Sequence, residues 1–439
     1  MERYIALLKE FLQELTASSE VSAEALFAET QAKAKGGDVV AQRNLGVLYA
    51  LGAGVGQDAA KALHWFQAAA NAGDAVAQHI LGVIYEEGAG GAYDDAEAVK
   101  WYRKSADRGY APAQGYLGWL YEAGSGVPQD YTKAVKWYRA AAEQGDVDAQ
   151  NSLGAMYDND YRVGQDDAEA VKWHRKAAEQ GDAEAQNNLG EMYEEGRGVS
   201  QDDAAAVKWY RKAAEQGYLV AQNNLGWMYQ EGRGVSQDDA EAVIWYRKAA
   251  EEGYERAQYS LGWMYQEGRG VLQDYAEALK WYRKAAEEGY TAAQYSCGVA
   301  YENGLGVAQD YVKAIKWYRK AAGEGHTDAQ NNLGRMYLDG RGVAQDYVKA
   351  AKWFRYAAQW GSVPAQKDLG VIYANGQGLT RNYEKAYVWL ARAADRGNED
   401  AQKMRDEIAA QLTPAQLARA KKAASQPLDV EVFAAESTA

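Results

Sequence analysis

The sequence predicts an all-α protein, a right-handed α-solenoid of about ten helical hairpins of 36 residues each, with capping helices at both ends. Three observations lead to this prediction. One pattern returns every 36 residues without insertion or deletion. Its apolar residues recur at helical spacing in two segments of each unit, and glycines separate the segments. Because such a unit can bury its apolar face only against its neighbours, the period indicates one elongated array rather than several globular domains.

Residues 1–36 are expected to form N-terminal capping helices. The first 16 residues carry one apolar stripe opposite charged residues, made of Ile5, Leu8, Phe11, Leu12 and Leu15. Residues 22–35 are similar to the second half of a repeat, but Glu29 stands where later units have tryptophan. Because the terminal units of a solenoid need a more polar outer face, we interpret this segment as a degenerate repeat.

Residues 37–397 are expected to contain ten repeats. In the unit that begins at Gly217, a first helix (helix A) ends at Gly232 and Gly234, which tolerate positive φ. Asp238 stands at the N-cap of a second helix (helix B), where it can accept a hydrogen bond from a free amide of the first turn. Aspartate or asparagine recurs there in all ten units. Each unit is therefore a helical hairpin.

Residues 398–424 are expected to form C-terminal capping helices. Thr413, Pro414 and Gln416 supply the N-cap residue, the first-turn proline and the N3 glutamine that begin a helix. Residues 425–439 show no helical period, and we expect them to be disordered.

Two helix positions are the same in all ten units. Tryptophan occupies one position of helix B, at residues 65, 101, 137, 173, 209, 245, 281, 317, 353 and 389, and we interpret these residues as core rather than as a ladder for a ligand. Glycine follows the helix A leucine, as at Gly226. Glycine inside a helix costs about 0.5 to 1 kcal/mol relative to alanine. We therefore expect it to admit a tryptophan or tyrosine ring of helix B.

These recurring residues carry a resemblance. The pattern A-x-x-x-L-G-x-x-Y-x-x-G-x-G-V-x-x-D-x-x-x-A-x-x-W, seen from Ala221 to Trp245, resembles that of the Sel-one-like repeat (SLR) family of tetratricopeptide-type helical solenoids. The resemblance covers the ten repeats and implies an adaptor or scaffold. It also implies that some bacterial relatives act in host interaction or as immunity partners of toxins. The secreted branch of the family carries paired cysteines, whereas Cys297 is the single cysteine here.

Charge and composition exclude several classes of partner and indicate a compartment. A net charge of -14 and a pI near 5.0 argue against nucleic acid or an anionic membrane as partner, because both are bound chiefly by clustered lysine and arginine. Lys9, Glu10 and Glu14 interrupt the first apolar stripe, so no signal peptide is expected, and no later apolar run is long enough to span a membrane. A single cysteine fits a reducing compartment. We expect a cytoplasmic protein.

No catalytic, metal or cofactor site is expected. His64, His79, His174 and His326 fall at four different positions of the unit and lack partners at metal-ligand spacing. The repeated Gly-x-Gly follows a helix rather than a strand, so we interpret it as a turn. Cys297 replaces the helix A leucine of its unit and is expected to be a buried small hydrophobe.

Candidate binding residues lie on the side of helix A that faces away from helix B. In related solenoids helix A lines the concave surface, so the resemblance implies that this side faces a groove. Three of the four tryptophans outside the recurring set share one outward position, and two tyrosines lie one turn earlier. Aromatic clusters of this kind are typical of binding surfaces, although the rings could instead be half-buried between neighbouring helices A. The candidates are Trp119, Asn187, Asn223, Trp227, Tyr259, Trp263 and Tyr295.

The two asparagines in this set stand at the repeat position of Tyr259, where they could bind the extended backbone of a partner or simply be solvated. The primary hypothesis is a non-enzymatic scaffold that binds a protein or peptide along helix A. The alternatives are an inhibitor or immunity protein that occludes a toxin or enzyme and, more remotely, a hydrolase. The loop at residues 158–167 is atypical because Asp160 and Arg162 replace its glycines.

Overall fold

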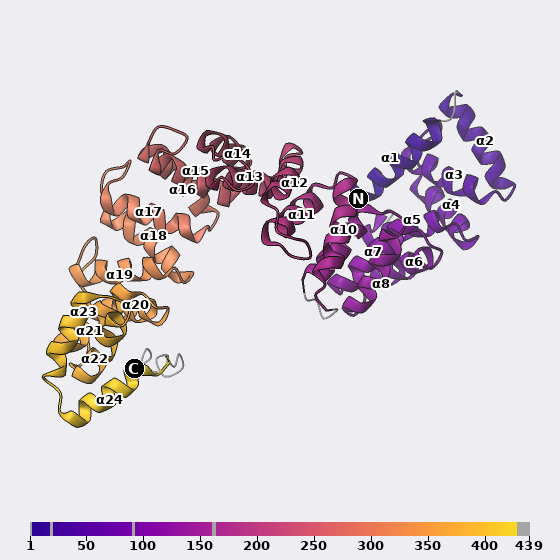
Figure 1. Cartoon of the computed structure of the whole chain (residues 1–439). Coiled ribbons are helices and arrows are strands. Elements are labelled where there is room, and N and C mark those ends of the chain that lie inside the picture. The colour runs from indigo at the N-terminus through magenta and orange to yellow at the C-terminus, as the bar shows by residue number, and fades with distance from the viewer. Residues whose placement is uncertain (1, 18–20, 90–92, 160–163, 428–439) are drawn as a thin grey trace. The chain divides into compact units, whose positions relative to one another are not determined.

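The computed structural model describes residues 2–17, 21–89, 93–159 and 164–427, and within these residues all regular secondary structure is helical (Figure 1). The prediction of an all-α protein is confirmed. The chain forms two compact units, Met1–Tyr218 and Leu219–Ala439, here called the N-terminal and C-terminal units.

From α3 to α22, helix A and helix B alternate along the chain, and α1, α2, α23 and α24 flank these hairpins. The N-terminal unit contains α1 (Glu2–Ala17), α2 (Ala23–Lys35), α3 (Val39–Leu51), α4 (Ala59–Asn71), α5 (Ala75–Glu87), α6 (Asp95–Asp107), α7 (Ala111–Ala123), α8 (Tyr131–Ala142), α9 (Val147–Asp158), α10 (Asp167–Glu179), α11 (Ala183–Glu195) and α12 (Asp203–Glu215). The C-terminal unit contains α13 (Leu219–Glu231), α14 (Asp239–Glu251), α15 (Glu255–Glu267), α16 (Tyr275–Glu287), α17 (Thr291–Asn303), α18 (Tyr311–Gly323), α19 (Thr327–Asp339), α20 (Tyr347–Gln359), α21 (Val363–Asn375), α22 (Tyr383–Ala394), α23 (Glu399–Ala409) and α24 (Pro414–Ser425).

Each hairpin is built by two local signals. Except in α9, which ends at the extended Asn159, helix A ends at a left-handed glycine, such as Gly268 with φ of 68° after α15, a conformation that other residues adopt only at a cost. Helix B begins at an aspartate or asparagine whose side chain accepts backbone amides in all ten hairpins. Asp274, for example, accepts from the amides of Ala276 and Glu277 at 2.9 and 3.0 Å. The predicted cap is therefore confirmed.

The glycine inside helix A packs against a ring of helix B, as predicted, but the ring is not that of the recurring tryptophan. A Cβ at Gly262 would lie 2.8 Å from the ring of Tyr282, the residue that follows Trp281. Half of the recurring tryptophans are buried, namely Trp101, Trp173, Trp245, Trp281 and Trp389. The other five are half-buried against the same cores. Tyrosine therefore fills the centre of six hairpins, and tryptophan packs outside it. Phe66, His174, Phe354 and Leu390 take the central place in the other four.

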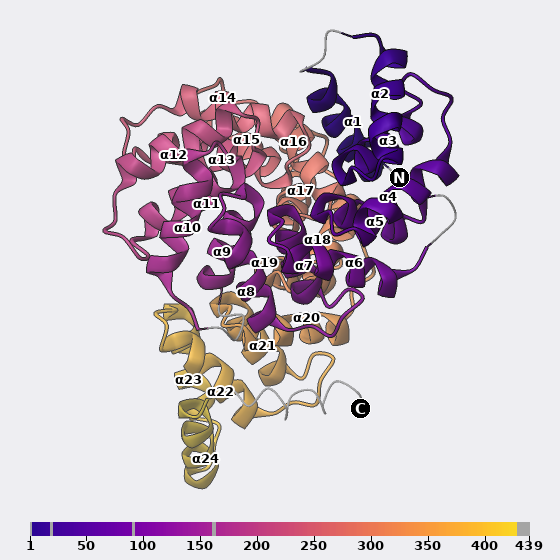
Figure 2. The same ribbon diagram turned by 90° about the vertical axis from the view of Figure 1, so that its right-hand side faces the viewer.

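The terminal helices pack in two different ways. In the N-terminal unit, α2 packs on α3 in the place of a helix B, whereas α1 crosses both α3 and α5, which are helices A (Figure 2). In the C-terminal unit, α23 and α24 both pack on α22, and Thr413 and Gln416 form the expected capping box. Asp160 and Arg162 of the atypical loop lie outside the described residues, as does the predicted tail from residue 428 onward.

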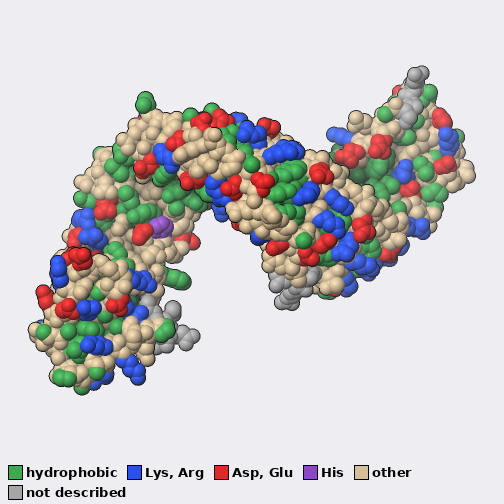
Figure 3. Space-filling view, in the orientation of Figure 1, with side chains coloured by type: hydrophobic (Ala, Val, Ile, Leu, Met, Phe, Trp, Pro, Cys, Tyr) green, Lys and Arg blue, Asp and Glu red, His purple; other side chains and the backbone are tan. Residues whose placement is uncertain are grey.

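The surface carries charges of both signs. Acidic and basic side chains are interspersed over the face shown in Figure 3, and no single basic patch stands out on it. Among the described helices, none combines the length and apolar character that a membrane span requires.

Candidate functional site

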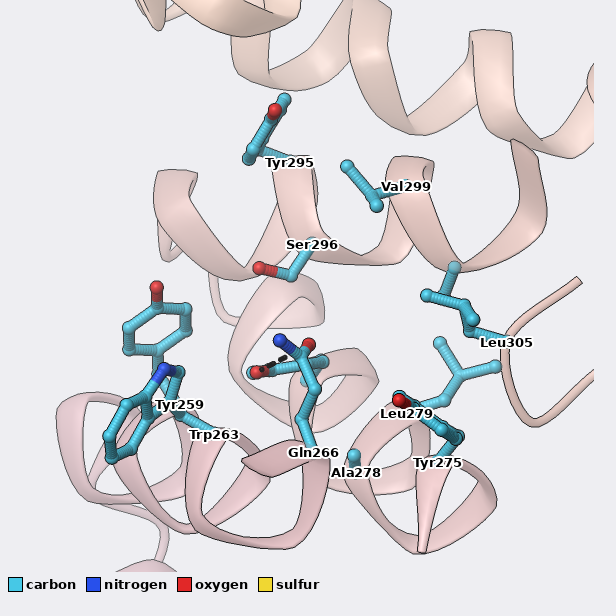
Figure 4. Close-up of a pocket in the computed structure, with 12 residues that line it drawn as sticks. Tyr259, Trp263, Gln266, Tyr275, Ala278, Leu279, Tyr295, Ser296, Val299 and Leu305 are labelled. Carbon is cyan, nitrogen blue, oxygen red and sulfur yellow. Dashed lines mark hydrogen bonds between the residues drawn. The ribbon is translucent and has the colours of Figure 1, made fainter. Parts of the chain in front are cut away.

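Three consecutive helices of the C-terminal unit enclose a pocket of about 310 Å³, here called the α15–α17 groove. Tyr259, Trp263 and Gln266 of α15 line one side, and Tyr295, Ser296 and Val299 of α17 line the other (Figure 4). The rest of the lining comes from α16, from α17 and from the turn after α17, at Tyr275, Ala278, Leu279, Tyr282, Ala300 and Leu305. None of the described residues that line the groove is charged.

Rings from behind support the aromatic walls. The ring centroid of Tyr259 lies 5.5 Å from that of Tyr282 and 5.3 Å from that of Tyr290. Tyr295 stacks on His326 with centroids 4.5 Å apart and ring planes 17° apart. Aromatic pairs at these separations attract one another beyond simple burial. The wall tyrosines are therefore held in place before any ligand arrives.

Trp263 lies on the α15 side of the groove (Figure 4). Its side chain is half-buried, and the guanidinium carbon of Arg269 lies 5.3 Å from its ring centroid. A cation at this distance is attracted by the ring face. Trp263 therefore offers ring surface to a ligand and is held by a neighbouring turn of its own repeat.

The polar groups of the groove are few and uncharged. The Tyr282 hydroxyl donates a hydrogen bond to Gln266 Oε1 at 3.1 Å. Burial raises the pKa of Tyr259 and of Tyr295, so both hydroxyls stay protonated near neutral pH and can donate. The groove is thus suited to an apolar surface that carries a small number of hydrogen-bonding groups.

The helix start beside this cluster lacks a side-chain cap. In α3, α5, α9 and α11 an aspartate at the N-cap accepts a backbone amide. At α17 the N-cap is Tyr290, whose side chain makes no cap hydrogen bond and whose ring contacts Tyr259. Replacing such a cap costs about 0.5 to 2 kcal/mol. Tyr110 and Tyr254 leave the starts of α7 and α15 uncapped in the same way, so an aromatic residue replaces the cap in several repeats.

The structure brings together three of the predicted residues, Tyr259, Trp263 and Tyr295. Trp227 and Asn223 lie one repeat earlier on α13 and do not line the groove. Trp227 is half-buried, with the Arg233 guanidinium 5.0 Å from its ring centroid. The carboxamide oxygen of Asn223 is buried and accepts no hydrogen bond from the described residues.

The other two predicted residues lie in the N-terminal unit. Trp119 is 44% exposed, stacks on Tyr116 and lines a pocket of about 620 Å³. The expectation that Asn187 faces outward is wrong, because its side chain is only 3% exposed. Asn187 donates instead to Glu191 one turn later at 3.0 Å, as side chains four residues apart on a helix can.

Sequence reasoning missed Tyr282, Tyr290, Ser296 and Gln266 as parts of the site. No signal was available for Tyr290, because its position carries tyrosine as often as aspartate, with Tyr110, Tyr218 and Tyr254 in other repeats. There was none for Tyr282 either, because tyrosine is the common residue at its position. Gln266 and Ser296 could not be predicted, because they line the groove only where α15 and α17, from two consecutive repeats, face each other.

Other reactive side chains, one cysteine and two histidines, are each buried apart from the others. Cys297 is buried as predicted, and burial raises the pKa of its thiol to about 12, which makes it a poor nucleophile near neutral pH. Burial lowers the pKa of His79 to about 3 and that of His174 to about 4. In the part of the chain that the structure describes, no group of three or more His, Cys, Asp or Glu side chains could hold a metal ion.

The sequence matches the model of the Sel1 repeat ten times in succession, at residues 39–74, 75–110, 111–146, 147–182, 183–218, 219–254, 255–290, 291–326, 327–361 and 363–398. No curated protein matches the chain.

Two similar solved structures also come from Sel1 repeat (SLR) proteins. The chain is similar to a protective antigen of uropathogenic Escherichia coli with an SLR fold, at 36% identity over 91% of this chain and 93% of that one, with a TM-score of 0.61. It is also similar to a Sel1 repeat protein from Oxalobacter formigenes, at 38% identity over 70% of this chain and 90% of that one, with a TM-score of 0.58. An immunity protein from Pseudomonas aeruginosa is 23% identical over 48% of this chain and 81% of that one; its TM-score of 0.34 carries no functional argument.

Proposed function

We propose that this chain, which belongs to the Sel1 repeat family, is a scaffold that binds a protein or peptide partner in the α15–α17 groove. Sel1 repeat proteins typically act as protein-interaction scaffolds. The observation that carries the proposal is the meeting of Tyr259, Trp263 and Tyr295, all half-buried, around one uncharged pocket. A few residues supply most of the binding energy of typical interfaces, and tryptophan and tyrosine are enriched among them. Trp119 and Trp227 are proposed as further contacts outside the groove.

The test is a double variant, Trp263→Ala with Tyr295→Asn. The repeat already carries alanine and asparagine at these two positions, at Ala155 and Asn151 of α9, so folding should be retained. The tagged wild-type chain and the variant are used for affinity capture from the native lysate, followed by mass spectrometry. Because the loss of one hot-spot residue typically costs about 2 kcal/mol or more, we expect partner binding to weaken by at least about 30-fold.

The matched control is Trp360→Ala, which removes a tryptophan that is 77% exposed and does not line the groove. This variant should capture the same partner as the wild type. Equal capture by all three proteins would contradict the proposal, and thermal melts would show whether the double variant is folded.

A further inference from the structure

The N-terminal helix of this chain already occupies a helix A surface. In α1, Leu8 is fully buried and Tyr4 is 9% exposed, and the helix packs on α3 and α5. Arg3 anchors one end, with its guanidinium 2.9 Å from Glu86 and 3.9 Å from the ring centroid of Tyr116. An amphipathic helix thus docks across consecutive helices A, with its apolar face inward (Figure 2).

The outward position of helix A shows the effect of this docking. It is occupied in the ten repeats by Val47, Val83, Trp119, Ala155, Glu191, Trp227, Trp263, Val299, Arg335 and Val371. Only Val47 and Val83 are buried, at 1% and 0% exposure, and they belong to α3 and α5. The other eight are half-buried or exposed. This position is therefore the surface that a docked helix covers.

The same space occurs six repeats later. The pocket beneath α1, of about 450 Å³, is lined by Ala50, Ala59, Leu63, Ile84 and Ala89. These residues hold the repeat positions of five residues of the α15–α17 groove, namely Gln266, Tyr275, Leu279, Ala300 and Leu305. In the N-terminal unit, Tyr4 and Ile5 of α1 complete the lining. In the C-terminal unit, no described helix takes that place.

An extended peptide is a poorer fit than a helix. A strand brings unpaired backbone N–H and C=O groups that must find partners once buried. The groove offers few such partners, and Gln266 and Tyr282 already bond each other. At the Tyr259 position, Asn187 and Asn331 could have bound an extended backbone in their own repeats, but both are buried, at 3% and 7% exposure. A helix bonds its own backbone and presents side chains only.

From this we infer that the α15–α17 groove binds an amphipathic helix of the partner, in the way that α3 and α5 bind α1. The inference rests on the proposed function and adds the class of partner. The apolar face of that helix would carry aromatic or aliphatic side chains four residues apart, as Tyr4 and Leu8 are in α1. Glu302 of α17 holds the repeat position of Glu86, but it already pairs with Arg341 at 3.0 Å. The partner's apolar face should therefore be uncharged, without an equivalent of the Arg3–Glu86 pair.

The test selects peptides for the full-length chain from two displayed libraries of 16 residues. The first follows the apolar pattern of residues 2–17 in a background of alanine, glutamate, lysine and glutamine, which favours helix. The second has the same apolar content with a proline in every turn, which prevents helix. We expect binders from the first library whose circular dichroism becomes helical on binding.

Two glutamate substitutions at the same repeat position locate the binding site. Val299→Glu places a charge in the groove, and Val371→Glu places one two hairpins away at the corresponding position of α21. The repeat tolerates this residue, because Glu191 occupies the position in α11. Selected helices should lose at least tenfold in affinity for the Val299→Glu protein and keep their affinity for the Val371→Glu protein.

The other outcomes separate the two proposals. If binders that depend on the groove come only from the proline library, the inference of a helical partner is wrong and the proposed function stands. Binders insensitive to Val299→Glu, or none from either library, would overturn both proposals for this groove. Selected helices that displace α1 from α3 and α5 bind outside the groove, so they count as binders insensitive to Val299→Glu.

Discussion

Each helix A has a glutamine in its first turn. The hydrogen bonds of its carboxamide depend on one residue at the end of the following helix B. Its Nε2 group donates to a backbone carbonyl of the preceding helix B, as from Gln258 to Ala250 at 3.1 Å. In α7, α9 and α11 its oxygen also accepts a bond from a second glutamine, which is Gln144, Gln180 or Gln216. In the repeat of α15 that second residue is Glu288, and the oxygen of Gln258 is buried without a hydrogen bond from the described residues.

We therefore predict that Glu288→Gln stabilises the C-terminal unit by about 1 kcal/mol, because the new amide can donate to the buried oxygen of Gln258 whereas a carboxylate cannot. Urea denaturation of the two proteins measures the difference. Glu287→Gln is the control for loss of charge, since its ion pair with Arg283 is exposed and long, at 3.7 Å, and contributes little. Equal stability of the Glu288→Gln protein and the wild type would mean that the oxygen is satisfied in another way.

At the scale of the helix, α17 combines a weak start with an aromatic wall. Its N-cap residue Tyr290 leaves the first-turn amides without the side-chain acceptor that Asp146 and Asp182 provide for α9 and α11. The ring of Tyr290 instead supports Tyr259 at the groove. An aspartate at the N-cap would make α17 more stable than Tyr290 does. The less stabilising residue thus stands where the partner is proposed to bind.

Tyr290→Asp should separate these two effects. We expect the free energy of unfolding to rise by about 1 kcal/mol through the restored cap, and the affinity for a groove ligand to fall because Tyr259 loses its support. Thermal denaturation and peptide binding measure the two quantities. Tyr290→Ala removes the ring without supplying a cap, so it should weaken binding with no gain in stability. Unchanged binding by both variants would show that the ring has no part in the groove.

Local signals explain which elements could be predicted. The N-cap at Asp238 and the glycines after helix A act within one unit, so the repeat period was enough to give each hairpin. The placement of α1 could not be predicted, because an apolar stripe shows that a face is buried but not which helices bury it. The orientation of Asn187 failed for a related reason, since a helical wheel ignores the hydrogen bond to Glu191.

For the whole molecule, the division into two units is hidden in the sequence, because the period passes through Tyr218 and Leu219 without a break. The units nevertheless differ in their buried titratable groups. His79 and His174, both buried, lie in the N-terminal unit, whereas the C-terminal unit has the half-buried His326. Each buried ring lacks a hydrogen bond at one nitrogen from the described residues, at Nδ1 of His79 and Nε2 of His174.

This difference predicts that acid destabilises the N-terminal unit first. Burial lowers the pKa of His79 to about 3 and that of His174 to about 4, from an ordinary value of 6.5. Between these values the unfolded chain binds protons that the folded chain does not, so stability is full above pH 6.5 and falls as the pH drops toward 4. For His174 the loss should reach about 2 to 3 kcal/mol at pH 4.5.

Hydrogen exchange at pH 7 and at pH 4.5, corrected for the intrinsic rate, would measure the opening free energy of each unit in one experiment, with the C-terminal unit as internal reference. His174→Tyr restores the residue that most repeats carry at this position, such as Tyr210, and fits against Gly154 as Tyr210 fits against Gly190. The variant should lose part of the acid sensitivity of the N-terminal unit and leave the C-terminal unit unchanged. An equal fall in both units would instead place the acid response in carboxylates common to every repeat.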